Sequence, residues 1–403
     1  MQPFKILFIA PMFPPQEGPE SYVNGKLAIA LRRNGWHLDV ITQAPTSIVK
    51  DTSNLWNKLN DCTYYLKQRN IFNNFILQTI FWLYQAYCLA MRLHKKNKYH
   101  VILSRAQPIW GHVLAWLLTI RTDVAWIANW NDPAPIRRYP PPYGFGPDAP
   151  MSAFSSYLFN KICSKANWHT FPCERLRNYM ISYMPKGTAN KSSVIAHIFL
   201  EDVAQNSSCL AKQHEKLILC HSGSTYYRNW QQFLLAFKMF IEKEHVNDVQ
   251  VNFVGWQPDD FRQTVIKYKL TDHIIIEPPV LYDASFSCLT AADILLLIEA
   301  GCNEGIFMPS KIADYAGAKK PLLAVSPTNG TMADLIKKYN WGLVADCGSV
   351  ESIYETLKIL YSQWKTGNLD KIYNAQSAYD LFTEKNIINE YNHLFHTLNL
   401  KKT

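Results

Sequence analysis

Short apolar runs and longer stretches of helical periodicity alternate along this chain. Near the N-terminus the apolar run Lys5–Ala10 is followed by a turn rich in proline and glycine. From Ser21 to Asn34 apolar positions recur at helical spacing, and Gly35 is a stop signal. The next apolar run is Leu38–Thr42. This strand–helix–strand unit predicts an α/β fold with a parallel, doubly wound sheet.

The same pattern continues through the first half of the chain. Further strands are expected at Val101–Ser104, Val124–Ala128 and near His169–Phe171, and helices at 151–165 and Cys173–Met184. Residues 133–150 are rich in proline and aromatic residues, so a long functional or covering loop is expected there.

A second series of strands and helices begins after the polar stretch Leu200–Gln213, which we interpret as a linker. Strands are expected at Leu217–Ser222, Val249–Val254, 274–276, 294–298 and 321–325, with a helix at Trp230–Glu244. The chain therefore predicts two Rossmann-like domains, at 1–200 and 214–371. A last helix, at about 372–400, could pack back on the first domain. Ligands tend to bind in the cleft between two such domains.

Residues 71–93 form an apolar stretch that would be about long enough to span a bilayer as a helix. Polar residues interrupt it, namely Asn73, Asn74, Gln78, Gln85 and Arg92. A buried helix is therefore the first interpretation. An in-plane helix at a membrane surface is the second, and the basic segment HKKNKYH that follows supports it. The apolar run at the N-terminus is too short for a signal peptide.

Composition narrows the class of protein. Of the 403 residues 48% are hydrophobic and 18% are charged, which is typical of a globular protein and not of a disordered one. The formal net charge of +9 favours an anionic partner, such as a nucleotide diphosphate, an anionic lipid surface or nucleic acid, although a solvated basic surface would also explain it. Nine cysteines without a C-x-x-C pair argue against a disulfide framework or a zinc site, and for a reducing, cytoplasmic compartment.

Two turns that follow expected strands carry candidate binding residues. Gly18 lies between a strand and a helix, where backbone N–H groups could approach a phosphate or a sugar, although a structural turn explains it as well. No G-x-G-x-x-G motif is present, so binding of a dinucleotide is poorly supported. In HSGSTYYRN, residues 221–229, Gly223 permits a tight turn, Ser224 offers a hydroxyl and an N–H group, and Arg228 is suited to a diphosphate. The alternative for Arg228 is an ordinary surface arginine.

Residues 298–334 are the most informative stretch. Pro309 is expected to open a helix, with Ser310 and Lys311 in its first turn, where a lysine opposes the helix dipole. A bound anion would explain that conflict. Asp314, one turn later, would accept hydrogen bonds from ribose hydroxyls. The alternative is a simple lysine–aspartate pair on a helix surface.

The segment PSKIADYAGAKKPLLAV resembles the donor-site signature P-S-K-x-x-E-Y-x-x-x-x-K-P of GT-B glycosyltransferases, particularly glycosyltransferase family four. Three further stretches are similar to that family: the first strand–helix–strand unit, the pair SRAQPIWGHVLAW and WIANWNDP, and the loop HSGSTYYR. The resemblance covers nearly the whole chain and is most specific over 309–325.

The resemblance implies two facing Rossmann domains and a retaining transfer from a nucleotide-diphosphate sugar, with a UDP-sugar as the favoured donor and no metal or other cofactor. Arg228 and Lys311 would neutralise the departing diphosphate, Asp314 would bind ribose, and Gly18 would approach the donor phosphate. The chain departs from the family in three places. The ribose acid is Asp314 and not glutamate, the first-loop G-G is Glu17–Gly18, and the acid pair eight positions apart is missing because position 306 is isoleucine. Glu304 is the candidate replacement for the first acid of that pair.

Four residues near expected strand ends are candidates for binding the acceptor, namely Arg105, His112, Asn129 and Asp132. A core histidine is the alternative for His112. The sequence thus predicts a glycosyltransferase that acts on a glycan or lipid-linked acceptor in surface polysaccharide or glycoconjugate synthesis, without a nucleic-acid partner, in the cytoplasm or peripherally at the inner face of the membrane. The alternatives are a nucleotide-sugar 2-epimerase and a degenerate homologue that binds nucleotide sugar as a scaffold or subunit.

Overall fold

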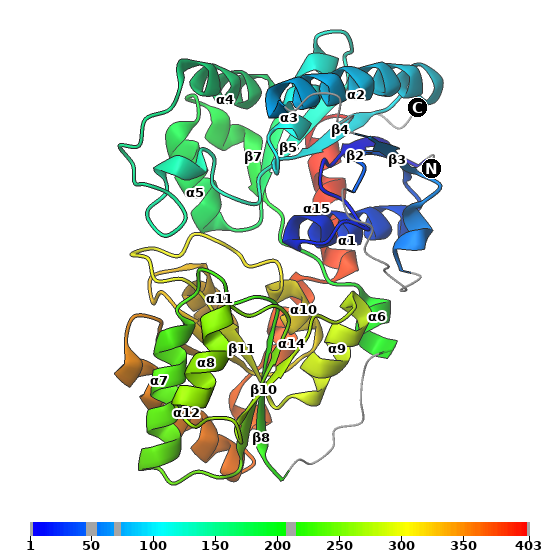
Figure 1. Cartoon of the computed structure of the whole chain (residues 1–403). Helices are drawn as coiled ribbons and strands as arrows, with labels where there is room; N and C mark the ends of the chain where they lie inside the picture. Colours follow the sequence, from blue (N-terminus) through cyan, green and yellow to red (C-terminus); the bar gives the residue numbers. More distant parts are fainter. Residues whose placement is uncertain (1–2, 46–54, 68–73, 207–214, 401–403) are drawn as a thin grey trace. The chain divides into compact units, whose positions relative to one another are not determined.

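A computed structural model of the chain describes residues 3–45, 55–67, 74–206 and 215–400. It divides into two compact units (Figure 1). The first unit contains Met1–Ile198 together with Glu384–Thr403, and the second contains Phe199–Thr383.

The first unit is built on a parallel sheet of seven strands in the order β3-β2-β1-β4-β5-β6-β7. The strands are β1 Lys5–Ile9, β2 His37–Gln43, β3 Thr63–Leu66, β4 Val101–Arg105, β5 Ala125–Asn129, β6 Trp168–Phe171 and β7 Ser192–Val194. The middle positions of the central strands are apolar because helices cover both faces of the sheet.

Helices lie on both faces of this first sheet (Figure 1). On one face are α1 Pro19–Arg33 and α15 Glu384–Thr397, which contact each other. On the other are α2 Phe75–Asn97, α3 Trp110–Thr119, α4 Ala153–Lys165 and α5 Glu174–Tyr183, and α3 contacts both α2 and α4. Short 3-10 helices are η1 Trp56–Leu59, η2 Ile136–Arg138 and η3 Thr188–Lys191.

The second unit is built on a parallel sheet of six strands in the order β10-β9-β8-β11-β12-β13. The strands are β8 Leu217–Ser222, β9 Val249–Val254, β10 Ile274–Glu277, β11 Ile294–Ile298, β12 Leu322–Ser326 and β13 Gly342–Asp346. Its helices are α6 Glu201–Asn206, α7 Trp230–Lys243, α8 Asp259–Lys267, α9 Tyr282–Ala291, α10 Ile312–Gly317, α11 Thr331–Tyr339, α12 Val350–Lys365, α13 Leu369–Ile372 and α14 Ala375–Leu381. The phenylalanine-rich face of α7 packs into the core of this unit.

In both sheets the order in which the chain adds strands reverses at one point. The chain moves outward in one direction from β1 and in the other from β4, and β8 and β11 repeat this arrangement. In open α/β sheets, ligands bind outside the carboxyl ends of the strands at such a switch point. The prediction of two doubly wound Rossmann-like units is confirmed, and each unit has one position of this kind.

Several sequence-based expectations need correction. The helix expected at about 372–400 is interrupted, with α14 ending at Leu381 and α15 beginning at Glu384. The expected linker Leu200–Gln213 includes helix α6, and residues 207–213 lie outside the described residues. Strands β3, β7 and β13 were not predicted.

The apolar stretch 71–93 forms α2 from Phe75 onward, and residues 71–73 lie outside the described part of the chain. The first interpretation, a buried helix, is correct for one face only. Trp82, Ala86, Ala90 and Leu93 are buried, whereas Ile76, Ile80 and Tyr84 are exposed. Among the described residues, no helix combines the length and the hydropathy needed to span a bilayer.

Candidate functional site

A lysine and a histidine meet at the switch point of the second sheet. His221 is fully buried in β8, and its Nδ1 lies 3.0 Å from the carbonyl oxygen of Leu296 in β11. Because that carbonyl can only accept, Nδ1 carries the proton and Nε2 is an acceptor. Nζ of Lys311 lies 3.3 Å from Nε2 and donates to it. One imidazole therefore connects strand β11 to the lysine side chain.

A tyrosine holds the short helix α10 against the same two strands. The hydroxyl of Tyr315 donates to the carbonyl oxygen of Leu296 (3.0 Å) and accepts from the backbone N–H of Ser222 (2.9 Å). Its ring is completely buried. These contacts fix the start of α10, and with it the position of Lys311.

The helix begins later than predicted. Residues 310 and 311 form a turn in which the N–H of Ile312 bonds to the carbonyl of Pro309 (3.0 Å), and Lys311 is the N-cap of α10. The prediction that Pro309 opens the helix is therefore wrong, although Lys311 still lies at the N-terminal end of α10. Burial and neighbouring charges also make Lys311 unusual.

Burial dominates the electrostatics of this cluster. Burial first, and then the positive charge of Arg228, lower the pKa of Lys311 to about 7, while Cys220 and Glu299 oppose that shift. Burial also raises the pKa of Glu299, the residue after β11, to about 7, against the effect of Arg228 and Lys311. Burial first, and then Lys311, hold the pKa of His221 well below its usual range, so the imidazole is neutral. An arriving anion would favour the protonated lysine and the protonated glutamic acid.

Glycines leave open space in front of the lysine. Gly223 has a φ of +95°, and a Cβ at this position would lie 3.0 Å from Nζ of Lys311. Gly255, after β9, has a φ of +129°, and a Cβ there would lie 3.1 Å from the backbone of Gly223. Side chains at either position would therefore crowd the lysine or the turn in front of it. The expectation that Gly223 makes a tight turn is confirmed by this geometry.

Side-chain amides hold the loops of this site together. Gln257 donates to the carbonyl oxygens of Gly223 and Gly255, both at 3.2 Å, and accepts from the hydroxyl of Thr225 at 2.7 Å. Asn229 accepts from the N–H of Gly301 and donates to the carbonyl of Cys347, both at 3.1 Å. The loops after β8, β9, β11 and β13 are thus cross-linked, so the site is supported on four strands.

The proposed ribose acid already has one hydrogen-bond donor. The hydroxyl of Tyr282 donates to Oδ1 of Asp314 at 2.6 Å. Burial first, and then the charge of Asp314, raise the pKa of Tyr282 well above its usual value, so the phenol stays protonated as the donor. Asp314 is partly exposed. The tyrosine fixes the orientation of a short carboxylate that a ligand can still approach.

Sequence reasoning missed several members of this site. His221 contacts Lys311 and Glu299 interacts with it electrostatically, although neither was selected. A histidine near the end of one buried strand and a glutamate directly after another were the available signals. The loops after β8 and β9 also expose large aromatic rings, namely Tyr226, Tyr227 and Trp256, which are suited to stacking on a sugar or a base. Ser224 and Glu304 are exposed in the loops after β8 and β11, and Ser310 is partly buried beside Lys311.

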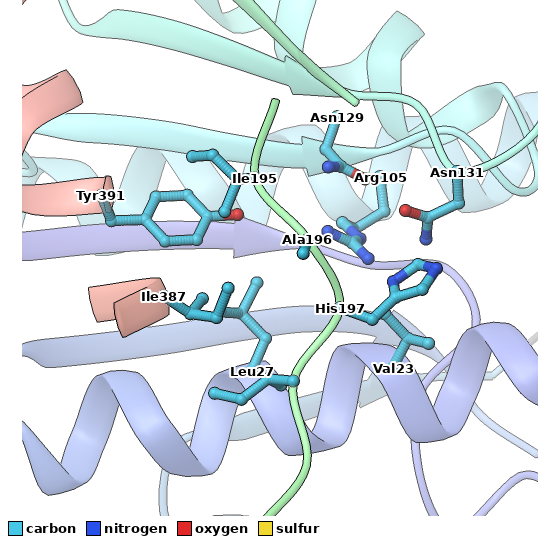
Figure 2. A pocket seen from close by; sticks show the side chains of 11 residues that line it. Val23, Leu27, Arg105, Asn129, Asn131, Ile195, Ala196, His197, Ile387 and Tyr391 are labelled. Carbon is cyan, nitrogen blue, oxygen red and sulfur yellow. The ribbon is translucent and has the colours of Figure 1, made fainter. Parts of the chain in front are cut away.

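In the first unit, Arg105 ends β4 at the switch point, and Asn129 ends the neighbouring strand β5. Both are almost completely buried. Nε of Arg105 lies 3.6 Å from Oε1 of Glu20, whose other oxygen accepts from Asn131 at 2.7 Å. Figure 2 shows the side chains of Arg105, Asn131 and His197 converging beside Asn129.

A cavity of about 10 Å³ separates these side chains from Ile387 and Tyr391 of α15, with residues 195–198 along one wall. A space of this size holds about one water molecule. Nε of Arg105 and Oδ1 of Asn129 are buried without a hydrogen bond among the described residues. The predicted acceptor-side residues Arg105 and Asn129 do meet, but as parts of a buried polar cluster.

His112 lies deeper in the core. It is completely buried, with Nδ1 2.7 Å from Oγ of Ser104, and that hydroxyl also accepts from the indole of Trp126 at 2.7 Å. Burial, and next the nearby His169 and Arg105, hold the pKa of His112 well below its usual range. These contacts favour the alternative of a core histidine. Of the remaining candidates, Asp132 is partly exposed after β5, and Gly18 is the N-cap of α1 with a φ of +136°.

Two kinds of chemistry fit the second unit. Lys311 and Arg228 offer positive charge in front of a glycine-lined turn, which suits a diphosphate, and Asp314 suits a sugar hydroxyl. Among the described residues, no group of three or more histidine, cysteine, aspartate or glutamate side chains has the arrangement of a metal site.

Comparison with known proteins gives similarity in structure only. No protein-family model matches the sequence, and no curated protein matches it. A glycosyltransferase from Rickettsia africae is similar over 100% of both chains, with 14% identity and a TM-score of 0.70. HepE from Anabaena, in complex with UDP and glucose, is similar over 98% of this chain and 100% of its own, with 14% identity and a TM-score of 0.68.

A UDP-N-acetylglucosamine 2-epimerase is also similar, over 100% of this chain and 98% of its own, with 13% identity and a TM-score of 0.59. Identities this low establish architecture and not activity. The two parallel-sheet units and these structural neighbours together show that the chain has the GT-B fold.

Proposed function

We propose that this chain is a glycosyltransferase that moves a sugar from a nucleotide diphosphate, with UDP as the favoured nucleotide, to a glycan or lipid-linked acceptor. One observation carries the proposal. Lys311, held by His221 at the switch point of the second sheet, faces a glycine turn and shares its electrostatic environment with Arg228 and Glu299. The likeness to solved glycosyltransferases, one of them with UDP and glucose, supports it.

The residues suggest how the reaction would proceed. As the bond between the sugar carbon and the diphosphate oxygen breaks, negative charge grows on the diphosphate, and Lys311 and Arg228 stabilise it there. The acceptor hydroxyl forms the new bond to the same carbon and gives up its proton to the departing diphosphate. We infer retention of configuration from the resemblance of 309–325 to retaining enzymes. We further infer that no metal is needed, because the two side chains supply the charge that a metal would otherwise supply.

The test begins with binding. A panel of nucleotide-diphosphate sugars is titrated against the full chain, and slow hydrolysis and transfer are followed for each sugar that binds, with and without EDTA. We expect at least one UDP-sugar to bind and to turn over in both conditions. Failure of every nucleotide sugar to bind would disprove the proposal, and binding without turnover in any acceptor mixture would favour the scaffold alternative.

A second candidate, a nucleotide-sugar 2-epimerase, has one observation in its favour. Glu299 has a pKa of about 7 and lies in the same cluster as the neutral His221, and a carboxyl group of that kind can transfer protons near neutral pH. An epimerase would exchange the proton at the sugar C2 with solvent. Incubation of the UDP-sugar in deuterated water, followed by mass spectrometry, separates the two functions, because a transferase leaves C2 unlabelled.

A further inference from the structure

Helix α2 exposes large apolar side chains on the face that does not contact the sheet. Ile76 is 66% exposed and Tyr84 is 67% exposed, and Phe75, Leu77 and Ile80 accompany them. The opposite face of α2, with Trp82 and Ala86, is buried in the first unit. Contiguous exposed apolar side chains of this size mark an interaction surface more often than an ordinary solvated face.

Neighbouring helices extend this apolar face. A groove of about 460 Å³ runs between α2 and the end of α3, lined by Ile80, Leu83, Tyr84, Tyr87, Leu117, Ile120 and Arg121. Ile120 is 59% exposed beside it. On α4, which contacts α3, Phe154 and Tyr157 are exposed, and the ring of Tyr157 lies 6.4 Å from that of Trp116 in α3. Figure 1 shows α2, α3 and α4 together on one face of the first sheet.

The charges on these helices have one sign. No aspartate or glutamate occurs between Asp61 and Asp123, a stretch that includes all of α2 and α3, and α4 has none either. Arg92, Lys95 and Lys96 are exposed near the end of α2, and Arg121 lies at the rim of the groove. At 3.6 residues per turn Lys95 lies in line with Leu77 and Tyr84. The three helices that carry the apolar face thus contribute only cations beside it.

The apolar face and the cations beside it together indicate which kind of partner binds there. A second copy of the chain, packed through the same face, would bring the cations of these helices against one another. A bilayer with anionic headgroups satisfies both features, because apolar side chains enter the acyl boundary while lysine and arginine remain at the phosphates. We propose that the face formed by α2, the end of α3 and α4 docks the first unit on an anionic lipid surface.

Vesicle flotation with the full chain tests this proposal, in the absence of any nucleotide sugar. Vesicles of phosphatidylcholine with phosphatidylglycerol should capture the protein, vesicles of phosphatidylcholine alone should capture it less, and added salt should weaken capture. The variant I76S/Y84S should lose at least about tenfold in affinity, and K95E at least about fivefold. The control I266S/I359S removes two exposed isoleucines of the second unit and should bind like the wild type.

All four substituted apolar side chains are exposed, so loss of folding is not a competing explanation for lost binding. Failure of the wild type to float would overturn the proposal, and so would equal capture of I76S/Y84S. Concentration-dependent dimers that disappear in I76S/Y84S, without any vesicle binding, would assign the face to self-association instead. Because no donor is present, the outcome is independent of the proposed transferase activity.

Discussion

Nζ of Lys311 donates to Nε2 of His221 across 3.3 Å, although 90 positions separate the two residues in the sequence. The histidine is neutral and its other nitrogen is bound to a strand carbonyl, so it positions the lysine without cancelling its charge. An amine that an arriving anion can protonate fully is thereby held beside a glycine turn.

The first prediction concerns this cation and Arg228. K311A and R228A should each abolish transfer, with a loss of about 100-fold or more, because each removes charge that stabilises the leaving diphosphate. Transfer is measured as release of the nucleotide diphosphate, and circular dichroism checks the fold. Full activity in either variant would show that the diphosphate is bound elsewhere. K243A, which removes a cation at the end of α7, is the matched control and should behave like the wild type.

Donor affinity should fall as the pH rises above 7. Lys311 and Glu299 each have a pKa of about 7 in the ligand-free chain, and the diphosphate favours the protonated form of both. On the alkaline side, each proton taken up on binding lowers the donor affinity by as much as about tenfold per pH unit. Calorimetry with a UDP-sugar between pH 6 and pH 9 measures this slope. E299Q should bind with a shallower slope, and an unchanged slope would exclude Glu299 from the coupling.

Asp314 should be responsible for recognising the ribose. D314N removes the charge that strengthens a hydrogen bond from a ribose hydroxyl, and about tenfold weaker binding of UDP is expected. The sharper measurement compares UDP with its 2′,3′-dideoxy analogue. The wild type should prefer UDP, and D314N should lose most of that preference. If both proteins discriminate equally, Asp314 does not contact the ribose.

Gly223 should be required both for its backbone conformation and because it has no side chain beside Lys311. G223A forces a residue with a side chain into a φ of +95° and places a Cβ 3.0 Å from Nζ of Lys311. G367A imposes a positive φ of +64° in the same unit, but its Cβ would have no atom within 4 Å. Both variants should lose about 1 kcal/mol of stability. Only G223A should also lose donor affinity, as measured by titration with UDP.

The first unit should lose stability in acid through His169. Burial first lowers the pKa of this residue from 6.5 to about 4, with Lys191 also lowering it and the Cys163 carbonyl opposing the shift. The folded state therefore prefers the neutral ring. The stability that the neutral His169 contributes is fully present above pH 6.5. It is lost as the pH falls from 6.5 towards 4, and the loss is about 3 kcal/mol in total.

Trp130 offers the readout, because its indole donates to Nδ1 of His169 at 3.1 Å. Urea unfolding is followed by tryptophan fluorescence at several pH values. H169Q should be less stable than the wild type at pH 7, and the difference between the two proteins should narrow as the pH approaches 4. A constant difference across this range would show that His169 does not titrate on unfolding.

The central strands of both units were predictable from the sequence. β1, β4, β8 and β11 contain short apolar runs because parallel strands covered on both faces bury side chains on both sides. The strands that were missed, β3, β7 and β13, lie at the edges of their sheets, where most residues are only partly buried. The break between α14 and α15 was missed as well.

The site residues also divide into those that the sequence identified and those that it did not. Spacing along the chain identified Lys311 and Asp314, because residues three apart on a turn or helix remain neighbours whatever the fold. The sequence could not bring His221 and Glu299 to the same lysine, because the order of strands in the sheet decides which loops meet. It also could not show that Arg105 and His112 are buried, or that one side of α2 is exposed. Those properties depend on which elements pack over each residue, and only the tertiary structure decides that.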